Sequence, residues 1–287
     1  MKLVRYGEPG RERPGMVDAK GALHDLADHV ADIDGAALVP EALELLRGLD
    51  SGRLPLVHGR HRLGAPIGKV GKVIAVGLNY ADHAAEAGLP IPEEPVVFMK
   101  ATSAISGPHD EVILPRGSKK CDWEVELAIV IGKEARYVPE EAAAEHIAGF
   151  TICNDVTDRH FQFERSGQWV KGKSADTFCP LGPWLVTADE IGDPQALDLW
   201  LEVNGERVQN GSTRTMIFGV NRIVSYISQF MSLQPGDVIP TGTPPGVGMG
   251  HKPQRWLKAG DEMRLGISGL GEQRQRVKAW EETISSS

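Results

Sequence analysis

The segment from Asp122 to Ile131 constrains the fold more than any other part of the sequence. Its residues, DWEVELAIVI, are mostly apolar and rich in β-branched side chains, which predicts a strand buried on at least one face. Side chains alternate along a strand, so Asp122, Glu124 and Glu126 share one face. Carboxylates on a core strand need protons or cations as partners. A divalent cation would satisfy them, and so would a face open to water.

A third carboxylate, Asp155, lies in a second short apolar run, FTICNDV, from Phe150 to Val156. Three carboxylates on neighbouring strands would form an all-oxygen site, which suits Mg²⁺, Mn²⁺ or Ca²⁺ better than zinc. Asp155 could instead end its strand and cap the element that follows. Both interpretations stay open at the level of these residues.

Bulk properties exclude several classes of function. The formal net charge of −8 argues against a nucleic-acid or anionic-membrane partner. No stretch approaches the roughly 18 consecutive apolar residues of a membrane span, and MKLVRYGEPGRERPG lacks the apolar core of a signal peptide. The three cysteines, Cys121, Cys153 and Cys179, lack metal-binding spacing. We therefore expect buried structural thiols and a cytoplasmic location.

The chain is expected to contain two parts. Residues 1–65 predict a small N-terminal domain with a strand at Lys2–Tyr6, a hairpin at Met16–Asp25 and a helix at Pro40–Leu49. Residues 70–282 contain short strands at regular spacing, separated by glycine turns, among them the Asn204-Gly205 hairpin signal. This pattern predicts a mostly-β, α+β fold with a mixed sheet.

A histidine and a glutamate lie three residues apart in the segment Ala81–Ala87, which predicts a short helix closed by Gly88. His83 and Glu86 would share one helix face and could form a hydrogen bond. A carboxylate orients a histidine ring and raises its basicity, which makes His83 a plausible general base. The alternative is a solvated helix with an incidental pair.

Two further segments have competing interpretations. Lys100 ends the expected strand Val96–Lys100 and could line a site, although a lysine that reaches the surface is the default. The glycine-rich run Thr241–Gly250, TGTPPGVGMG, could let consecutive N–H groups bind a carboxylate, or could be only a stiff turn. The Gly172-Lys173-Ser174 sequence is no phosphate loop, because the upstream glycine and the strand–loop–helix context are missing.

The E-x-E element at Glu124–Glu126 and the N-D-V element at Asn154–Val156 resemble the fumarylacetoacetate hydrolase family, and the resemblance covers roughly residues 70–280. It implies a fumarylacetoacetate hydrolase-like mixed β-sandwich or roll, in which Glu124, Glu126 and Asp155 hold Mg²⁺ or Mn²⁺. The N-Y-x-x-H-x-x-E pattern resembles the family's lid helix, where the residues matching His83 and Glu86 activate water.

The same resemblance implies roles for residues that would attract no notice alone. Lys173 would steady negative charge on the substrate, and the substrate-binding positions would be Gln162, Thr243, Gly242 and Lys100. Many family members carry Asp where His160 stands, which leaves the partner of Arg159 open.

The function implied is hydrolysis of the C3–C4 bond of a 2,4-dioxo acid to pyruvate and a short acid. Overall similarity, including the opening KLVRYG, is greatest to bacterial acylpyruvate hydrolase-type enzymes of sugar acid catabolism. Those enzymes convert 2,4-diketo-3-deoxy-L-rhamnonate or L-fuconate to pyruvate and lactate. The alternatives are oxaloacetate decarboxylation, or lyase, isomerase or hydratase action at the same site, and a non-catalytic metal- or sugar-acid-binding protein. We expect a small-molecule 2-keto acid as partner and a homodimer or higher homo-oligomer.

Overall fold

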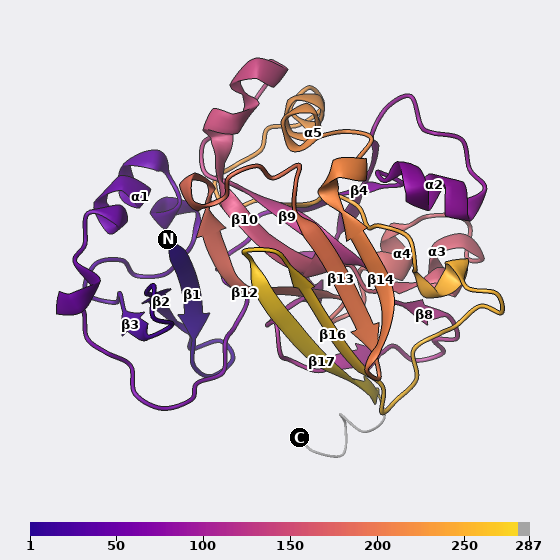
Figure 1. The fold of residues 1–287 in the computed structure, drawn as a ribbon, viewed down its shortest axis with the longest axis horizontal. Helices are drawn as coiled ribbons and strands as arrows, with labels where there is room; N and C mark the ends of the chain where they lie inside the picture. The colour runs from indigo at the N-terminus through magenta and orange to yellow at the C-terminus, as the bar shows by residue number, and fades with distance from the viewer. Residues whose placement is uncertain (281–287) are drawn as a thin grey trace.

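The computed structural model describes residues 1–280 and consists mainly of strands surrounded by short helices (Figure 1). The strands are β1 (Lys2–Tyr6), β2 (Arg13–Val17), β3 (Leu23–Asp25), β4 (Val73–Gly77), β5 (Val96–Lys100), β6 (Ile105–Ser106), β7 (Val112–Leu114), β8 (Cys121–Asp122), β9 (Val125–Ile131), β10 (Ile147–Asn154), β11 (Thr157–Asp158), β12 (Cys179–Thr187), β13 (Asp198–Val203), β14 (Glu206–Ser212), β15 (Val238–Pro240), β16 (Glu262–Ile267) and β17 (Gly271–Ala279). The α-helices are α1 (Pro40–Arg47), α2 (Ala81–Ala87), α3 (Arg159–Phe163), α4 (Val170–Lys173) and α5 (Val220–Ile227). The 3-10 helices are η1 (Gly35–Ala37), η2 (Ser51–Arg53), η3 (Thr102–Ala104), η4 (Glu140–His146), η5 (Ala188–Glu190), η6 (Thr213–Thr215) and η7 (Gly248–Gly250).

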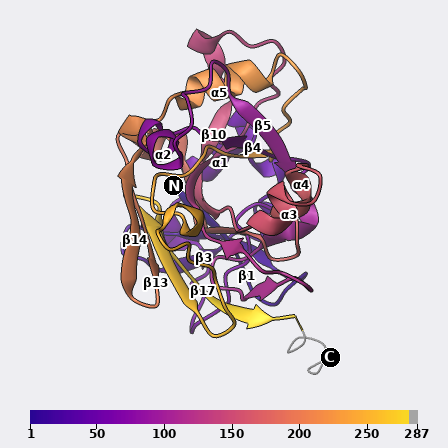
Figure 2. The same ribbon diagram turned by 90° about the vertical axis from the view of Figure 1, so that its right-hand side faces the viewer.

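Two sheets pack face to face around the core. A ten-stranded mixed sheet has the order β3-β2-β1-β12-β10-β9-β15-β4-β5, with β6 beside β12. A five-stranded sheet, β14-β13-β16-β17-β7, covers β9, β10 and β12, and a small β11-β8 pair lies at one side. In the perpendicular view α2, α3, α4 and β5 gather around one end of these sheets (Figure 2). The predicted mostly-β, α+β fold is confirmed.

The central strand β9 is buried along its whole length, because β10 and β15 flank it and the second sheet covers its face. The predicted continuous strand from Asp122 to Ile131 is wrong in one respect: it is divided into β8 and β9. The backbone leaves the ladder at Trp123 and Glu124, whose N–H groups donate instead to the side chains of Asp122 (2.9 Å) and Asn154 (3.2 Å). The expected alternative of a face open to water is also wrong.

The N-terminal segment joins the large sheet. Lys2 and Leu3 of β1 pair with Val186 and Leu185 of β12, and the predicted hairpin appears as β2 and β3. The division into domains at 1–65 and 70–282 stays a prediction, and residues 281 and 282 lie outside the described part of the chain.

Local expectations were mostly accurate elsewhere. Asn204 and Gly205 have φ of +53° and +80° between β13 and β14, as a type I′ hairpin requires. The acidic segment Glu140–His146 forms the 3-10 helix η4. Within residues 1–280 no helix combines the length and the apolar character that a membrane crossing requires.

Candidate active site

Three carboxylates meet where β9 begins and β10 ends. Glu126 lies in β9, Glu124 in the break before it, and Asp155 directly after β10. The register pairs Cys153 with Glu126, and the Asp155 N–H donates to the Glu124 carbonyl at 2.9 Å. These contacts place one oxygen from each carboxylate within 4.8 Å of the others, in a buried setting. The structure therefore brings the three predicted ligands together.

Two of these carboxylates already have cationic partners. Glu124 accepts hydrogen bonds from Arg159 at 2.5 Å and Lys173 at 2.6 Å, and Asp155 accepts from Lys173 at 2.6 Å and from Lys100. Burial alone would raise the pKa of Glu124, but Arg159 and Lys173 outweigh it and lower this pKa to about 2. Glu124 is therefore ionised throughout the physiological range.

Glu126 has no cationic partner among the described residues. Its carboxylate accepts one hydrogen bond, from the Gly242 N–H at 2.8 Å. Burial, then Asp155 and Glu124, raise the pKa of Glu126 well above its ordinary value. A bound cation would remove this penalty, and an all-oxygen donor set fits Mg²⁺ or Mn²⁺. The residues present thus fit the expected metal.

Lys100 is buried, so the expectation of a surface lysine is wrong. Its side chain is fully excluded from solvent and its Nζ donates to Asp155 and to the Val156 carbonyl, at 3.2 Å for the latter. It does not line the cavity described below. The structure places Lys100 behind Asp155, one of the three predicted metal ligands.

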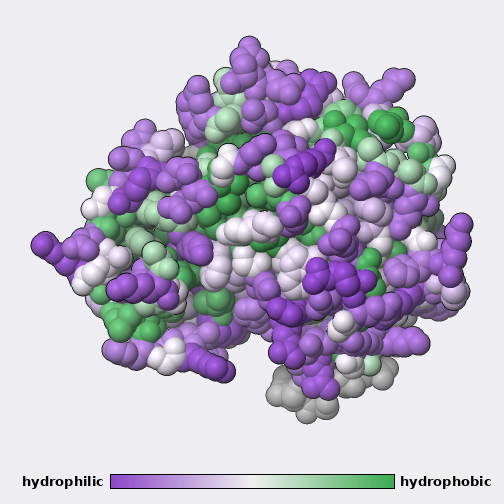
Figure 3. All heavy atoms as spheres, viewed as in Figure 1, coloured by the Kyte–Doolittle hydropathy of each residue, from purple (hydrophilic) through white to green (hydrophobic). Residues whose placement is uncertain are grey.

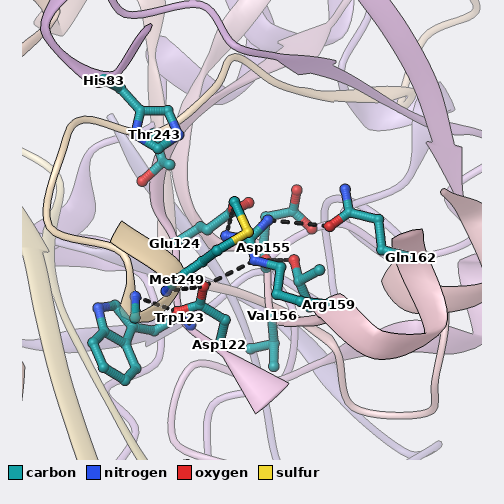
Figure 4. A network of polar contacts seen from close by, with 12 residues as sticks. His83, Asp122, Trp123, Glu124, Asp155, Val156, Arg159, Gln162, Thr243 and Met249 are labelled. Carbon is teal, nitrogen blue, oxygen red and sulfur yellow. Dashed lines mark hydrogen bonds and ion pairs between the residues drawn. The ribbon is translucent and has the colours of Figure 1, made fainter. Parts of the chain in front are cut away.

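A buried ion pair that was not predicted from the sequence joins Asp122 and Arg159. The Arg159 Nε donates to Asp122 at 2.8 Å while its Nη2 holds Glu124 (Figure 4). This supplies the partner of Arg159 that the His160 departure had left open. The available signal was the spacing of Asp122 two residues before Glu124, which put both carboxylates on one expected face.

The backbone N–H groups of the glycine-rich loop donate to carboxylates of the protein itself. Gly242 donates to Glu126, Gly246 donates to Glu86 at 2.9 Å, and Gly248 donates to Asp122 at 2.6 Å. The Met249 N–H is a second donor to Asp122, at 3.1 Å. The loop therefore fixes three carboxylates of the protein, and binding of a substrate carboxylate by the same loop stays a prediction.

The predicted His–Glu pair is formed. On α2 the His83 Nδ1 lies 3.0 Å from the Glu86 carboxylate, and Gly88 closes the helix with φ +65°. Burial would raise the pKa of Glu86, but the contacts with His83 and the Gly246 N–H lower it. An ionised Glu86 fixes the ring proton on Nδ1 and leaves Nε2 as an acceptor.

One cavity of about 210 Å³ unites these groups. Its polar lining comprises His83, Glu124, Glu126, Asp155, Arg159, Gln162, Lys173 and Thr243. The Gln162 oxygen accepts from Arg159 at 3.2 Å, and its amide nitrogen is turned away from Arg159 (Figure 4). The Thr243 hydroxyl donates to the Val125 carbonyl and accepts from Gln209, both at 2.9 Å. This hydroxyl is therefore occupied within the protein.

We expect Asp122→Asn to lower the free energy of unfolding by about 3–5 kcal/mol, the usual cost of removing one partner of a buried ion pair. Asp122 is fully buried and accepts from Arg159 and from two loop amides. Urea unfolding in the presence of EDTA measures the effect. The exposed Asp198→Asn variant should change stability by no more than about 0.5 kcal/mol. A loss below about 1 kcal/mol in Asp122→Asn would contradict a structural role for the pair.

The fold and the site together define a class of protein, in which two packed sheets carry a cluster of three buried carboxylates that could hold a cation, beside a histidine–glutamate pair. The fumarylacetoacetate (FAA) hydrolase C-terminal family matches residues 72–278, and the chain belongs to this family of enzymes. Solved structures similar to this chain include proteins named as hydrolases and as isomerases.

Individual relatives cover nearly the whole chain. A Burkholderia multivorans protein named "Putative hydrolase" is 59% identical over 280 residues, 97% of this chain and 99% of the relative. The fumarylacetoacetate hydrolase of Exiguobacterium antarcticum is 39% identical, with a TM-score of 0.84 over 97% of this chain and 99% of that one. The maleylpyruvate hydrolase of Sphingobium sp. SYK-6, solved with manganese(II) and pyruvate, is 31% identical, with a TM-score of 0.81 over 97% and 99%.

Proposed function

We propose that this protein is a metal-dependent hydrolase that cleaves the C3–C4 bond of a 2,4-dioxo acid and releases pyruvate. The observation that carries the proposal is a single cavity lined both by the carboxylate cluster and by the His83 base. The maleylpyruvate hydrolase relative, which was solved with Mn²⁺ and pyruvate, supports the choice of metal and product.

Glu124, Glu126 and Asp155 would hold Mg²⁺ or Mn²⁺. When bound, the cation would act as a Lewis acid toward the oxygens of the 2-keto acid. Lys173 lies against two of the ligand carboxylates, where its positive charge also stabilises negative charge that develops on the substrate. Lys100 would position Asp155 from behind, and Arg159 would position Glu124 from the cavity wall.

Neutral donors would orient the substrate. The amide nitrogen of Gln162, which has no hydrogen-bond partner within residues 1–280, is available to a substrate oxygen. Because the Thr243 hydroxyl is occupied, we assign recognition of the substrate carboxylate to the Thr243 backbone N–H. Gly242 contributes indirectly, since its N–H orients Glu126.

His83 would start the reaction as a general base. Its Nε2 takes a proton from water while Glu86 holds the opposite ring nitrogen. The water oxygen bonds to C4, the C3–C4 bond breaks, and its electron pair stays on C3. Return of the proton to C3 completes the methyl group of pyruvate, and the C4 fragment leaves as a carboxylic acid. One water is consumed and no oxidant or reductant is needed.

Decarboxylation of oxaloacetate would leave the same electron pair on C3, and an isomerisation at this site would use the same electron pair. Neither reaction needs a base that activates water, so the His83–Glu86 pair favours hydrolysis. The deoxy-sugar acid substrates implied by the KLVRYG opening are the narrowest form of the proposal.

The test is a screen of 2,4-dioxo acids with Mg²⁺ and with Mn²⁺, scored for released pyruvate and for the acid formed from C4. We expect one equivalent of each product and no activity in EDTA. Release of carbon dioxide from oxaloacetate without pyruvate from any dioxo acid would favour the decarboxylase. Tight metal binding with no turnover of any 2-keto acid would favour the non-catalytic alternative.

A further inference from the structure

One wall of the active-site cavity is apolar, and we propose that it binds a hydrocarbon tail carried by C4 of the substrate. This inference rests on the proposed function and adds the substrate class: 2,4-dioxo acids with an alkyl or aryl tail, rather than a carboxylated or polyhydroxylated one. The apolar wall is formed by six side chains: Val76, Leu78, Val96, Phe98, Phe163 and Trp169.

The apolar wall comes from elements that surround the carboxylate cluster. Val76 lies near the end of β4, Val96 and Phe98 lie on the neighbouring β5, and Trp169 directly precedes α4 (Figure 2). The Lys173 Nζ lies 5.0 Å from the centre of the Phe98 ring. The apolar surface therefore begins next to Lys173. Because Lys173 would stabilise the pyruvyl end of the substrate, C4 and its substituent would lie against this surface.

The aromatic residues of the wall form a fixed arrangement. Trp169 makes edge contacts with Phe98 and Phe163, with ring centres 5.3 Å and 5.8 Å apart and interplanar angles of 60° and 83°. Its ring packs directly on Gly77, where an added Cβ would come within 2.6 Å. This close approach holds the ring in place, so the surface is preformed for a hydrocarbon tail.

A charged tail would find no partner on this wall. Arg159 and Lys173, the cations that line the cavity, are each already paired with two protein carboxylates. The polar side-chain group of the apolar wall is the Trp169 indole N–H, a single neutral donor. A second substrate carboxylate would be buried without a counter-ion, and a polyol would lose most of its hydrogen bonds.

The residues at the opening of the cavity are also apolar. Leu89 lines the cavity with 52% of its surface exposed, and Ile91 nearby is 60% exposed. In the space-filling view, hydrophobic surface gathers where the segment after α2 runs (Figure 3). A tail longer than the cavity would therefore leave across apolar surface.

The experiment compares pyruvate release, with Mn²⁺, from 2,4-dioxo acids that carry methyl, n-pentyl, phenyl, carboxyethyl or dihydroxypropyl tails. We expect kcat/KM to be at least about 10-fold higher for pentyl or phenyl than for methyl, and at least about 10-fold lower for the other two. Trp169→Ala should reduce the phenyl-to-methyl ratio by about 10-fold or more. The matched control is Phe230→Ala, an exposed phenylalanine outside the cavity, which should preserve the ratio.

Leu89→Arg provides a gain-of-function arm, because it places a cation at the solvent-exposed edge of the cavity. It should raise kcat/KM for the carboxyethyl substrate by about 10-fold.

Wild-type preference for the carboxyethyl or dihydroxypropyl substrate would overturn the inference, while pyruvate release would still uphold the proposed function. If no dioxo acid releases pyruvate, the proposed function fails. In that case the dissociation constants of N-phenyl and N-carboxyethyl oxamate, measured by calorimetry with Mn²⁺, decide the tail preference. Tighter binding of the charged N-carboxyethyl analogue would refute the inference of an apolar tail.

Discussion

Replacing Glu126 by glutamine is expected to abolish metal-dependent turnover without unfolding the protein. Among the three proposed ligand carboxylates, Glu126 is the one that lacks a cationic partner in the described residues, while Glu124 and Asp155 are held by lysine and arginine. Its free oxygen is therefore the one most available to a metal ion. We expect Mn²⁺ affinity to fall by more than about 100-fold, beyond the range typical of outer-sphere substitutions.

The metal-free stability of Glu126→Gln separates this effect from misfolding. Asp155 and Glu124 repel a charge on Glu126, so the uncharged glutamine should leave the free energy of unfolding in EDTA unchanged or higher. Calorimetry with Mn²⁺ and urea unfolding measure the two quantities. Glu41→Gln, at an exposed position on α1, is the control and should alter neither. Wild-type metal affinity and rate in Glu126→Gln would place the metal site elsewhere.

His83→Ala should lower kcat by about 10²–10⁴-fold, the usual range for loss of a general base. Metal affinity should hardly change, because none of the three ligand carboxylates is bonded to His83. The measurements are kcat and the Mn²⁺ dissociation constant of one preparation, with the exposed His29→Ala variant as control.

A structural role for His83 would produce the opposite pattern. His83 is buried on a seven-residue helix, so a packing role would appear as a marked loss of thermal stability with normal kcat. The Glu86→Gln variant further distinguishes a catalytic role of His83 from a packing role. It weakens the orientation of the ring and should lower kcat less than loss of the base itself.

The parts of the site that could be predicted are those set by local geometry. Strand alternation placed Glu124 and Glu126 together, and helix spacing paired His83 with Glu86; both hold in the structure. The mixed-sheet fold followed from short strands separated by turns such as Asn204-Gly205.

The remaining parts depend on contacts between distant segments. Lys100 was expected to reach solvent because nothing near it in sequence demands a cation, whereas Asp155 meets it from 55 residues away. Arg159 and Asp122 are 37 residues apart, and the pairing of β8 with β11 brings them together. The strand break at Glu124 likewise depends on the Asn154 side chain of another strand.

The way in which the glycine-rich loop holds its carboxylates also affects how the enzyme can diverge. At position 249 the group that donates a hydrogen bond to Asp122 is the backbone N–H. Every amino acid except proline possesses this group. The Met249 side chain, by contrast, faces the substrate cavity. Substitutions at position 249 can therefore change the shape of the substrate cavity while the hydrogen bond from the backbone N–H to Asp122 is kept. Gly248 has no such freedom, because an added Cβ would lie 2.0 Å from the Arg255 carbonyl oxygen. One loop thus places a position that tolerates a change of side chain directly beside one that tolerates none.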